Sequence, residues 1–308
     1  MQRKKSVQLE YYELLERRRR LDNDEKSWYQ SLKRGYEGEC LFDDYVDEVL
    51  GALVLGYLSD LTLKHNRVTQ IDSLLVTDEV IFQFEIKNYA MDLTWTHQQW
   101  QFGNGHSLND DPVVQLQRSS SILRNILGEL GFESPPIVPI LVFINPDSFV
   151  DLKDDCSVKV LRSFELRRFL EELRSCYSSL SRAGSERVNQ VCQHILHYQC
   201  EPAFSNFGHS VRDLENRAPI PTGIICPVCG NRELEYGGRT ITCNCGHSES
   251  KNHALKRTIK EAEILEPNFE LTYKAINTFI QESLSKSSIT RVLRELRRNK
   301  GDEGHSKM

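Results

Sequence analysis

The chain has 308 residues, of which 39% are hydrophobic and 27% charged, and its formal net charge is -5 at pH 7. This length predicts two domains, or one domain with appended segments. The negative net charge argues against bulk electrostatic adhesion to nucleic acid, and no apolar run is long enough to span a bilayer.

Residues 1–30 predict an N-terminal charged helix over about residues 7–20. Arginines occupy all of positions 17–20, and they could lie along a phosphate backbone, although a solvated helix face is the simpler interpretation. A second helix is predicted from near Gly35 to about Leu50. Glycine weakens a helix interior, so Gly35 and Gly38 indicate that the backbone approaches the sheet or a phosphate chain closely here.

Two strands are predicted over residues 70–77 and 80–87, joined by the two-residue turn Asp78-Glu79. This register places Asp72 directly opposite Glu85. Side chains directly opposite each other in an antiparallel pair stand about 5 Å apart at Cβ. The two carboxylates could therefore hold one cation.

The second of these strands carries the pattern Glu-x-Lys at Glu85 and Lys87. Strand residues alternate between faces, so these two side chains share a face with Gln83 while Phe82 and Phe84 point the other way. We expect one face to be the core and the other to carry chemistry. A charged face open to solvent is the alternative, because Glu and Lys are common surface residues, but such a pair is unusual in so apolar a strand.

The elements that follow alternate between helix and strand. Helical spacing of apolar residues runs from Pro112 to about Gly131, with Pro112 suited to the first turn. A strand buried on both faces is predicted over 137–144, a short strand over 158–161 and an amphipathic helix over 164–173. This order predicts an α/β domain with a mixed sheet.

Four motifs resemble, in order and spacing, those of the nuclease-related domain (NERD) of the PD-(D/E)xK nuclease superfamily. They are Gly35-Tyr-Glu-Gly-Glu39, Gln70-Ile-Asp72, Phe84-Glu-Ile-Lys-Asn-Tyr89 and Asp111-Pro-Val-Val-Gln115. The resemblance covers about residues 31–175. It implies a PD-(D/E)xK-like mixed sheet flanked by helices.

The resemblance also implies a role for each matching residue. Asp72 and Glu85 would be ligands of Mg²⁺ or Mn²⁺, with Glu39 as an auxiliary carboxylate. Lys87 would be the catalytic lysine, and Gln115 would contact phosphate or substrate. The five residues together form the candidate catalytic site.

Hard oxygen ligands select magnesium or manganese over zinc. A divalent ion held by carboxylates lowers the pKa of its bound water and stabilises charge on a phosphate. Lys87 could orient or deprotonate the attacking water, or neutralise the phosphate. The family commonly has Asn-Pro where this chain has Asp111-Pro112, so Asn109, Asp110 and Asp111 carry no assigned role.

A second metal site is predicted in the cysteines. Cys226-Pro-Val-Cys229 is followed, after thirteen residues, by Cys243-Asn-Cys245. Two thiolate pairs separated by a hairpin-length segment are typical of a tetrahedral zinc site. The single spacer in the second pair leaves His247 as a possible substitute ligand.

A ribbon of this size buries too little to fold alone, so the Zn²⁺ is expected to be structural, with the ribbon docking substrate or a protein partner. A disulfide pair is disfavoured because the sequence shows no signal peptide, and a thioredoxin-like motif because no helix follows. Glycines at 230 and 246 permit the tight turns.

The remaining segments are predicted to be helical. Residues 176–222 form a helical connector that ends in a proline-containing linker. Two short helices follow the ribbon over 271–284 and 289–298, with Ser288 as N-cap. The arginines of the last helix could belong to a helix-turn-helix DNA reader, although a packing helix with a solvated basic face is commoner.

The predicted organisation has five regions: an N-terminal charged helix (1–30), the nuclease-like domain (31–175), the connector (176–222), the zinc ribbon (223–250) and a C-terminal helical region (251–308). The other cysteines, at 40, 156, 176, 192 and 200, show no paired spacing. They predict free thiols in a reducing compartment, and hence a cytoplasmic protein with no membrane partner.

The sequence therefore predicts a metal-dependent nuclease that acts on nucleic acid, with DNA favoured over RNA. The alternative is a non-catalytic nucleic-acid-binding or signalling adaptor derived from a nuclease fold. A binding module has no use for adjacent carboxylates that repel phosphate, so Asp72, Glu85 and Lys87 favour the enzyme. A zinc-dependent transcription factor built on the C-terminal helices would leave those carboxylates unexplained.

Overall fold

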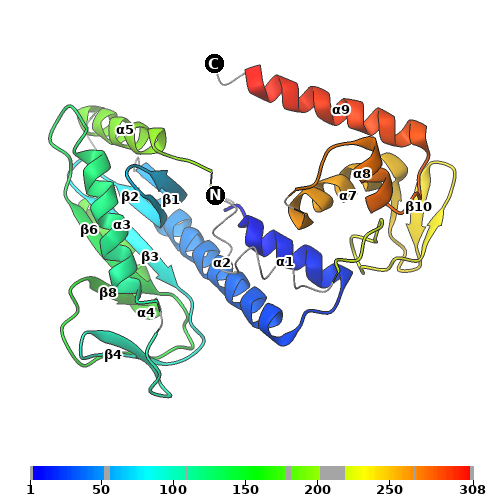
Figure 1. Ribbon diagram of the computed structural model, residues 1–308. Coiled ribbons are helices and arrows are strands. Elements are labelled where there is room, and N and C mark those ends of the chain that lie inside the picture. The colour runs from blue at the N-terminus through cyan, green and yellow to red at the C-terminus, as the bar shows by residue number, and fades with distance from the viewer. Residues whose placement is uncertain are drawn as a thin grey trace. The chain divides into compact units, whose positions relative to one another are not determined.

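A computed structural model describes residues 3–51, 56–108, 110–177, 182–201, 219–266 and 268–305 (Figure 1). The chain forms two compact units, and each unit combines segments that are distant in the sequence. The first unit is Met1–Lys4 with Ser31–Asn206, and the second is Lys5–Gln30 with Phe207–Met308.

The first unit is built on a five-stranded sheet in the order β1-β2-β3-β6-β8. The strands are β1 (Gly56–Lys64), β2 (Val68–Val76), β3 (Ile81–Lys87), β6 (Ile137–Phe143) and β8 (Lys159–Arg162). The first three strands are antiparallel, whereas β3, β6 and β8 run parallel. The predicted mixed α/β fold is confirmed.

The β2–β3 pair has the predicted register. Ser73 pairs with Phe84, and Val76 pairs with Ile81. The side chain of Thr77 closes the turn, because its Oγ1 accepts from the backbone N–H of Val80 at 2.8 Å. The ladder ends at the Ser73–Phe84 pair, so the two strands separate where the next residue, Asp72, faces the end of β3.

Helices cover both faces of the sheet. On one face, α2 (Asn23–Leu50) and α4 (Ser163–Cys176) form a core with the even-numbered aromatic residues of β3. On the other face, α3 (Pro112–Leu127) and α5 (Arg182–His197) pack in a second core (Figure 1).

The sequence predicts that the second face of β3 carries chemistry along its length. This prediction is wrong for most of the strand, because that face is packed against α3. Ile81 belongs to the second core, and Gln83 exchanges hydrogen bonds with Ser119 and Ser120 of α3. Polar chemistry is confined to the carboxyl end of the strand, where Glu85 and Lys87 lie.

Two predicted helices have different bounds. Helix α2 begins at Asn23 rather than near Gly35, and the carboxylate of Asp22 accepts from the N–H of Glu25 at its start. A Cβ on Gly38 would lie 2.6 Å from Cβ of Asn88, so this glycine allows the helix to approach the end of the sheet. Helix α3 ends at Leu127 instead of near residue 131.

The segment predicted as a connector contributes to the first unit. In α5, the residues Val188, Val191 and Ile195 are buried in the second core, against β1 and α3. A small sheet of β4 (Leu93–Thr96), β5 (Gln99–Phe102) and β7 (Val150–Leu152) was not predicted. It packs Trp95 and Trp100 against the end of β6.

The second unit combines α1 (Val7–Arg18) with a small sheet and three C-terminal helices. The sheet contains β9 (Leu234–Tyr236), β10 (Thr240–Cys243) and β11 (Ser248–Ser250), and the helices are α7 (Lys251–Leu265), α8 (Tyr273–Phe279) and α9 (Lys286–His305). Ile224 and Ile241 lie in one core with these helices. The ribbon is thus joined to the C-terminal helices rather than separate from them.

The predictions for the ends of the second unit need correction. Arg18 does not lie on a solvated face, because it is buried and pairs with Glu261 of α7. Helix α9 starts before Ser288, whose N–H donates to Oγ of Ser285, so Ser285 occupies the capping position. Within the described part of the chain, no helix has the length and apolar character needed to cross a membrane.

Candidate functional site

The five residues of the predicted catalytic site come from four elements of the first unit. Glu85 and Lys87 are at the carboxyl end of β3, and Asp72 lies beside them on β2. Glu39 comes from α2, and Gln115 comes from the first turn and a half of α3.

Glu85 and Lys87 form a buried ion pair. Glu85 is 1% exposed, and its Oε1 lies 2.7 Å from Nζ of Lys87. Oε1 has no other partner among the described residues. On its other side, Nζ donates to Oε1 of Gln115 at 3.3 Å. The lysine thus links β3 to α3.

Asp72 is fixed where β2 and β3 separate. Its Oδ2 accepts a hydrogen bond of 2.7 Å from the backbone N–H of Ile86, so the carboxylate takes the place of a strand partner. Burial is the main reason that the pKa of Asp72 is raised. Burial and the charge of Asp72 also raise the pKa of Glu85 to about 7.

Glu39 adds a third carboxyl group. Burial and the charge of Asp72 raise its pKa to about 8. The pKa of Lys87 is lowered by burial, but Glu85 and Asp72 outweigh this effect and raise it. The charged forms of Glu39 and Glu85 are therefore disfavoured by burial and by their closeness to Asp72.

A buried arginine from the N-terminal segment lies against this group. The guanidinium of Arg3 donates to Oε2 of Glu39 and to the backbone carbonyl of Asp72, each at 3.0 Å. It also forms a two-pronged contact with Asp43, at 2.8 and 3.1 Å, and reaches Oγ of Ser73 at 2.9 Å. Arg3 holds Glu39 in place relative to β2.

The three carboxylates do not form a closed ligand set. Of all His, Cys, Asp and Glu side chains that the structure describes, only four cysteines offer ligand atoms that all lie within 4.8 Å of one another. The residues nevertheless suit a divalent cation chemically. They offer hard oxygen ligands, and burial and the charge of Asp72 raise the pKa of both Glu39 and Glu85 beside it.

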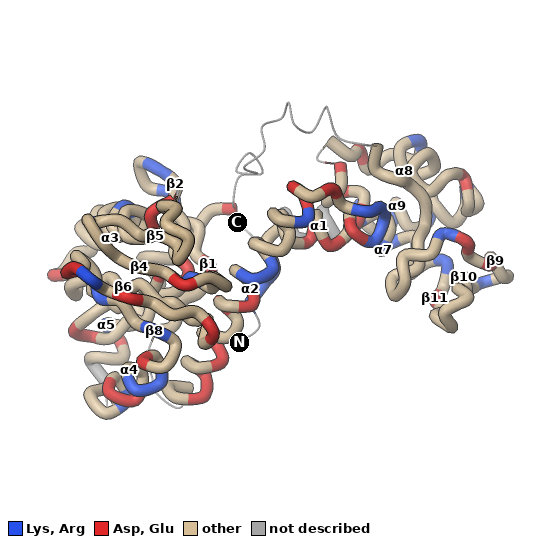
Figure 2. The backbone as a smooth tube through the Cα atoms, turned by 90° about the horizontal axis from the view of Figure 1, so that it is seen from below, with Lys and Arg blue, Asp and Glu red and all other residues tan. Residues whose placement is uncertain are grey.

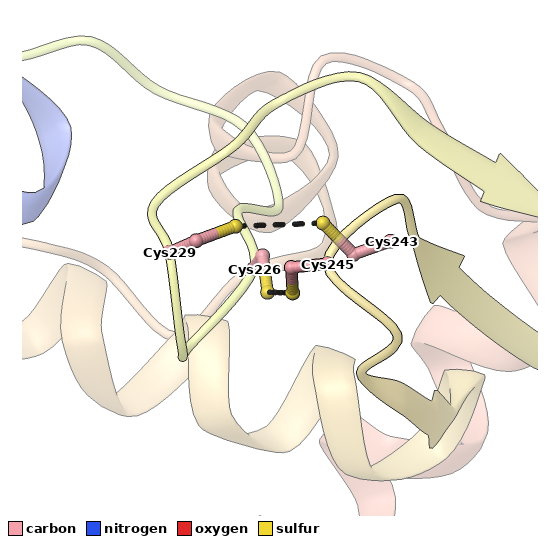
Figure 3. A group of neighbouring side chains, drawn as sticks. All are labelled: Cys226, Cys229, Cys243 and Cys245. Atoms are coloured by element: carbon pink, nitrogen blue, oxygen red, sulfur yellow. Dashed lines mark hydrogen bonds between the residues drawn. The ribbon is translucent and has the colours of Figure 1, made fainter.

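The four cysteines are Cys226, Cys229, Cys243 and Cys245, and their sulfur atoms face one another from two turns (Figure 3). Sγ of Cys226 lies 3.6 Å from that of Cys245, and Sγ of Cys229 lies 3.5 Å from that of Cys243. Sulfur atoms placed 2.3 Å from a tetrahedral zinc ion would be about 3.8 Å apart. The cluster is compatible with a zinc ribbon.

The turns of the cluster explain its glycines. Gly230 and Gly246 have φ angles of 70° and 90°, which side chains rarely adopt. His247 is not part of the ligand set, although its backbone carbonyl accepts from the N–H of Cys243. All nine cysteines of the chain are free thiols.

A comparison with known protein families finds a match within the first unit. Residues 34–144 match the family model of the nuclease-related domain. Searches of curated proteins and of solved structures found no match. The segment that matches the nuclease-related domain contains Glu39, Asp72, Glu85, Lys87 and Gln115, so all five predicted site residues lie in it.

The structure adds polar neighbours that were not predicted for the nuclease-related domain. Asp43 lies one helical turn after Glu39, and its Oδ1 also accepts from the hydroxyl of Tyr57 at 2.5 Å. The sequence does offer a signal for Asp43, because this carboxylate lies within the apolar stripe of α2. Arg3 lies outside residues 34–144, and nothing in its local sequence indicates a buried position. Asp111 caps α3 by accepting from the N–H of Val113 at 2.8 Å, and Asn109 lies outside the described residues.

Proposed function

We propose that the nuclease-related domain hydrolyses phosphodiester bonds of nucleic acid with Mg²⁺ or Mn²⁺, with DNA favoured over RNA. The observation that carries this proposal is the position of Lys87. Its ammonium group is held between Glu85 and Gln115, at the strand end beside Asp72. A lysine among carboxylates, directed by an amide, suits a site that must bind a metal ion and a phosphate together.

In this proposal, Asp72 and Glu85 hold the divalent ion, and Glu39 supports it. A bound divalent ion polarises the phosphate and lowers the pKa of its bound water. Lys87 places positive charge where the phosphate gains negative charge in the transition state. Gln115 orients the ammonium group and contacts the substrate.

We further propose that the cysteine cluster holds a structural Zn²⁺ and that the ribbon docks substrate or a protein partner. The cluster provides all four ligands itself, which is typical of a structural rather than a catalytic zinc site. The five cysteines outside the cluster form no disulfide, which fits a reducing, cytoplasmic location.

A specific feature favours the adaptor as the second candidate. Helix α9 buries Ile289, Val292 and Leu293, while its exposed positions are largely basic. Arg291 contacts Asn252, and Arg297 donates to the carbonyl of Leu271, so two of these arginines already have partners in the second unit. An adaptor would bind nucleic acid through this helix and need no carboxylates.

The deciding experiment compares cleavage and binding. Purified protein is incubated with supercoiled, linear and single-stranded DNA in magnesium, manganese or EDTA, and cleavage that requires a divalent metal is expected. Replacing Asp72→Asn and Glu85→Gln together removes two negative charges, so cleavage should disappear while metal-free binding strengthens. Metal-independent binding that ignores these changes but is lost with Arg291→Ala and Arg294→Ala would establish the adaptor.

A further inference from the structure

A groove of about 970 Å³ lies beside the candidate site in the first unit. One wall is the exposed side of α3, and the other is the tip of the β1–β2 hairpin over residues 65–69. Gln115 lines the groove and accepts from Nζ of Lys87, so one end of the groove reaches the candidate site. A molecule in the groove would extend to the reacting groups.

The helical wall has a regular construction. Lining residues Gln115, Arg118, Ile122 and Asn125 follow helical spacing, so they form one stripe along α3. The opposite side of the helix is buried in the second core. From Gln115 to Asn125 the stripe covers about 15 Å, at the helical rise of about 1.5 Å per residue.

The groove carries two arginines without ionic partners. Arg67 at the hairpin tip and Arg118 on α3 are both exposed, and neither side chain has a hydrogen bond or an ion pair with another described residue. Figure 2 marks the Lys and Arg positions of the chain in blue. Several other arginines of the first unit are engaged, for example Arg3 with Asp43 and Arg167 with Glu48. Arg124, which does not line the groove, also has no ion pair among the described residues. Two free guanidinium groups on opposite walls provide sites for phosphate groups.

Most of the other lining side chains suit a sugar–phosphate chain, whereas Asp110 and Asp111 add two carboxylates that offset the charges of the two arginines. Asn66 and Asn125 offer amide groups, and Thr69 and Ser121 offer hydroxyls, which can bond phosphate oxygens or sugars. The carboxylate of Asp111 is already engaged with the N–H of Val113. Nε2 of His65 lies 2.8 Å from Oε1 of Glu129, so this nitrogen is already engaged and is not assigned to phosphate binding.

We infer that this groove is the path of the nucleic-acid strand that leads to the candidate site, with Arg67 and Arg118 as phosphate contacts. The inference rests on the proposed function, because the strand must enter where the phosphodiester is cleaved. A length of about 15 Å corresponds to about four nucleotides of one duplex strand, at 3.4 Å each. The groove therefore binds backbone rather than a single base.

Binding at two salt concentrations tests the inference. The full chain is mixed with fluorescein-labelled DNA in Ca²⁺, which supports binding without requiring turnover, and anisotropy is measured for wild type, Arg67→Ala, Arg118→Ala and the double variant. Counterion release predicts about eightfold weaker binding at 0.1 M salt for each lost phosphate contact, and a salt slope smaller by about 0.9 for duplex DNA. The matched control is Arg124→Ala, an exposed arginine of the same helix that does not line the groove.

The outcomes separate this inference from the proposed function. If the double variant binds like Arg124→Ala while wild type still cleaves DNA, the groove is not the strand path and the nuclease proposal stands. If wild type never cleaves but the double variant loses binding, the groove is a nucleic-acid site and the nuclease proposal fails. A wild-type protein that binds no DNA, or that binds polyglutamate equally well through the same arginines, would overturn the inference.

Discussion

The two candidate metal sites of this protein are built in opposite ways. The cysteine cluster takes all its ligands from two turns within twenty residues, Cys226 to Cys245, and its sulfur atoms already have nearly tetrahedral spacing. The carboxylate site gathers Glu39, Asp72 and Glu85 from three elements, and Lys87 and Arg3 bind two of these carboxylates. A structural site is complete by itself, whereas a reaction site keeps charged groups that a substrate or metal ion can engage.

The largest effect is expected from Lys87→Ala. If Lys87 acts on the reacting phosphate, cleavage should fall by about 10²- to 10⁴-fold while the DNA affinity remains close to that of wild type. Cleavage and binding assays on the same preparation measure this difference. Lys153→Ala, at an exposed lysine of the same unit, is the control. Unchanged cleavage by Lys87→Ala would remove this lysine from the mechanism.

The next largest effect is expected from a change in the cysteine cluster. Because this cluster takes all its ligands from the ribbon, the loss of structure should be confined to the second unit. Cys226→Ser should lose about one bound zinc per chain and unfold the ribbon, because the metal supplies the folding free energy of such a small element. Elemental analysis and thermal unfolding measure both changes. Cys176→Ser, at an exposed cysteine of α4, should retain the zinc. If Cys226→Ser abolished DNA cleavage while the ribbon stayed folded, the two metal sites would not be independent of each other.

Arg3 tests whether the carboxylate site depends on a distant segment. Arg3→Ala leaves the buried Asp43 without its ionic partner, and removing one partner of a buried ion pair costs about 3–5 kcal/mol. Arg3→Lys retains the charge but cannot reproduce the two-pronged contact, so it should be milder. Denaturant unfolding of the two variants measures the difference. If neither variant lost measurable unfolding free energy, Arg3 would not stabilise the carboxylate site.

The smallest effect concerns pH. The pKa values of Glu85 and Glu39 are raised to about 7 and about 8, from an ordinary value of 4.5. Between the ordinary pKa and the raised ones, the folded protein binds more protons than the unfolded chain. The free energy of unfolding of the metal-free protein should therefore fall as the pH rises from about 5 to about 8. Mg²⁺ should raise the Tm more at pH 8 than at pH 6. Glu85→Gln should flatten the pH dependence, and an unchanged slope would argue against this origin.

Sequence reasoning succeeded where the signal is local. The register of β2 and β3 follows from a two-residue turn, and the cysteine cluster follows from ligand spacing. Helix α7 also has a local signal, because Ser250 caps it and Leu255 and Ile259 lie on its buried stripe, so it could have been predicted.

Other features depend on tertiary contacts that no local pattern specifies. The sequence predicts helix α5 only as part of a connector, because its apolar stripe does not indicate which surface it covers. Arg3 lies in a short basic run that resembles a solvated tail, yet it contacts Asp43 and Ser73, about 40 and 70 residues away. Its position follows from the folded arrangement of α2 and β2, not from its neighbours in the sequence.

The discontinuity of the first unit affects how a shortened protein would behave. A fragment of residues 31–206 would contain every residue of the predicted catalytic site but would lack Arg3. In that fragment Glu39 would lose its ionic contact, and Asp43 and Ser73 would face an empty space of guanidinium size. If this fragment were inactive, the loss of Arg3 could explain the result, so the fragment would not test the roles of Lys87 or of the metal ion. Adding a short peptide that carries Arg3 in trans would distinguish a missing residue from a missing activity.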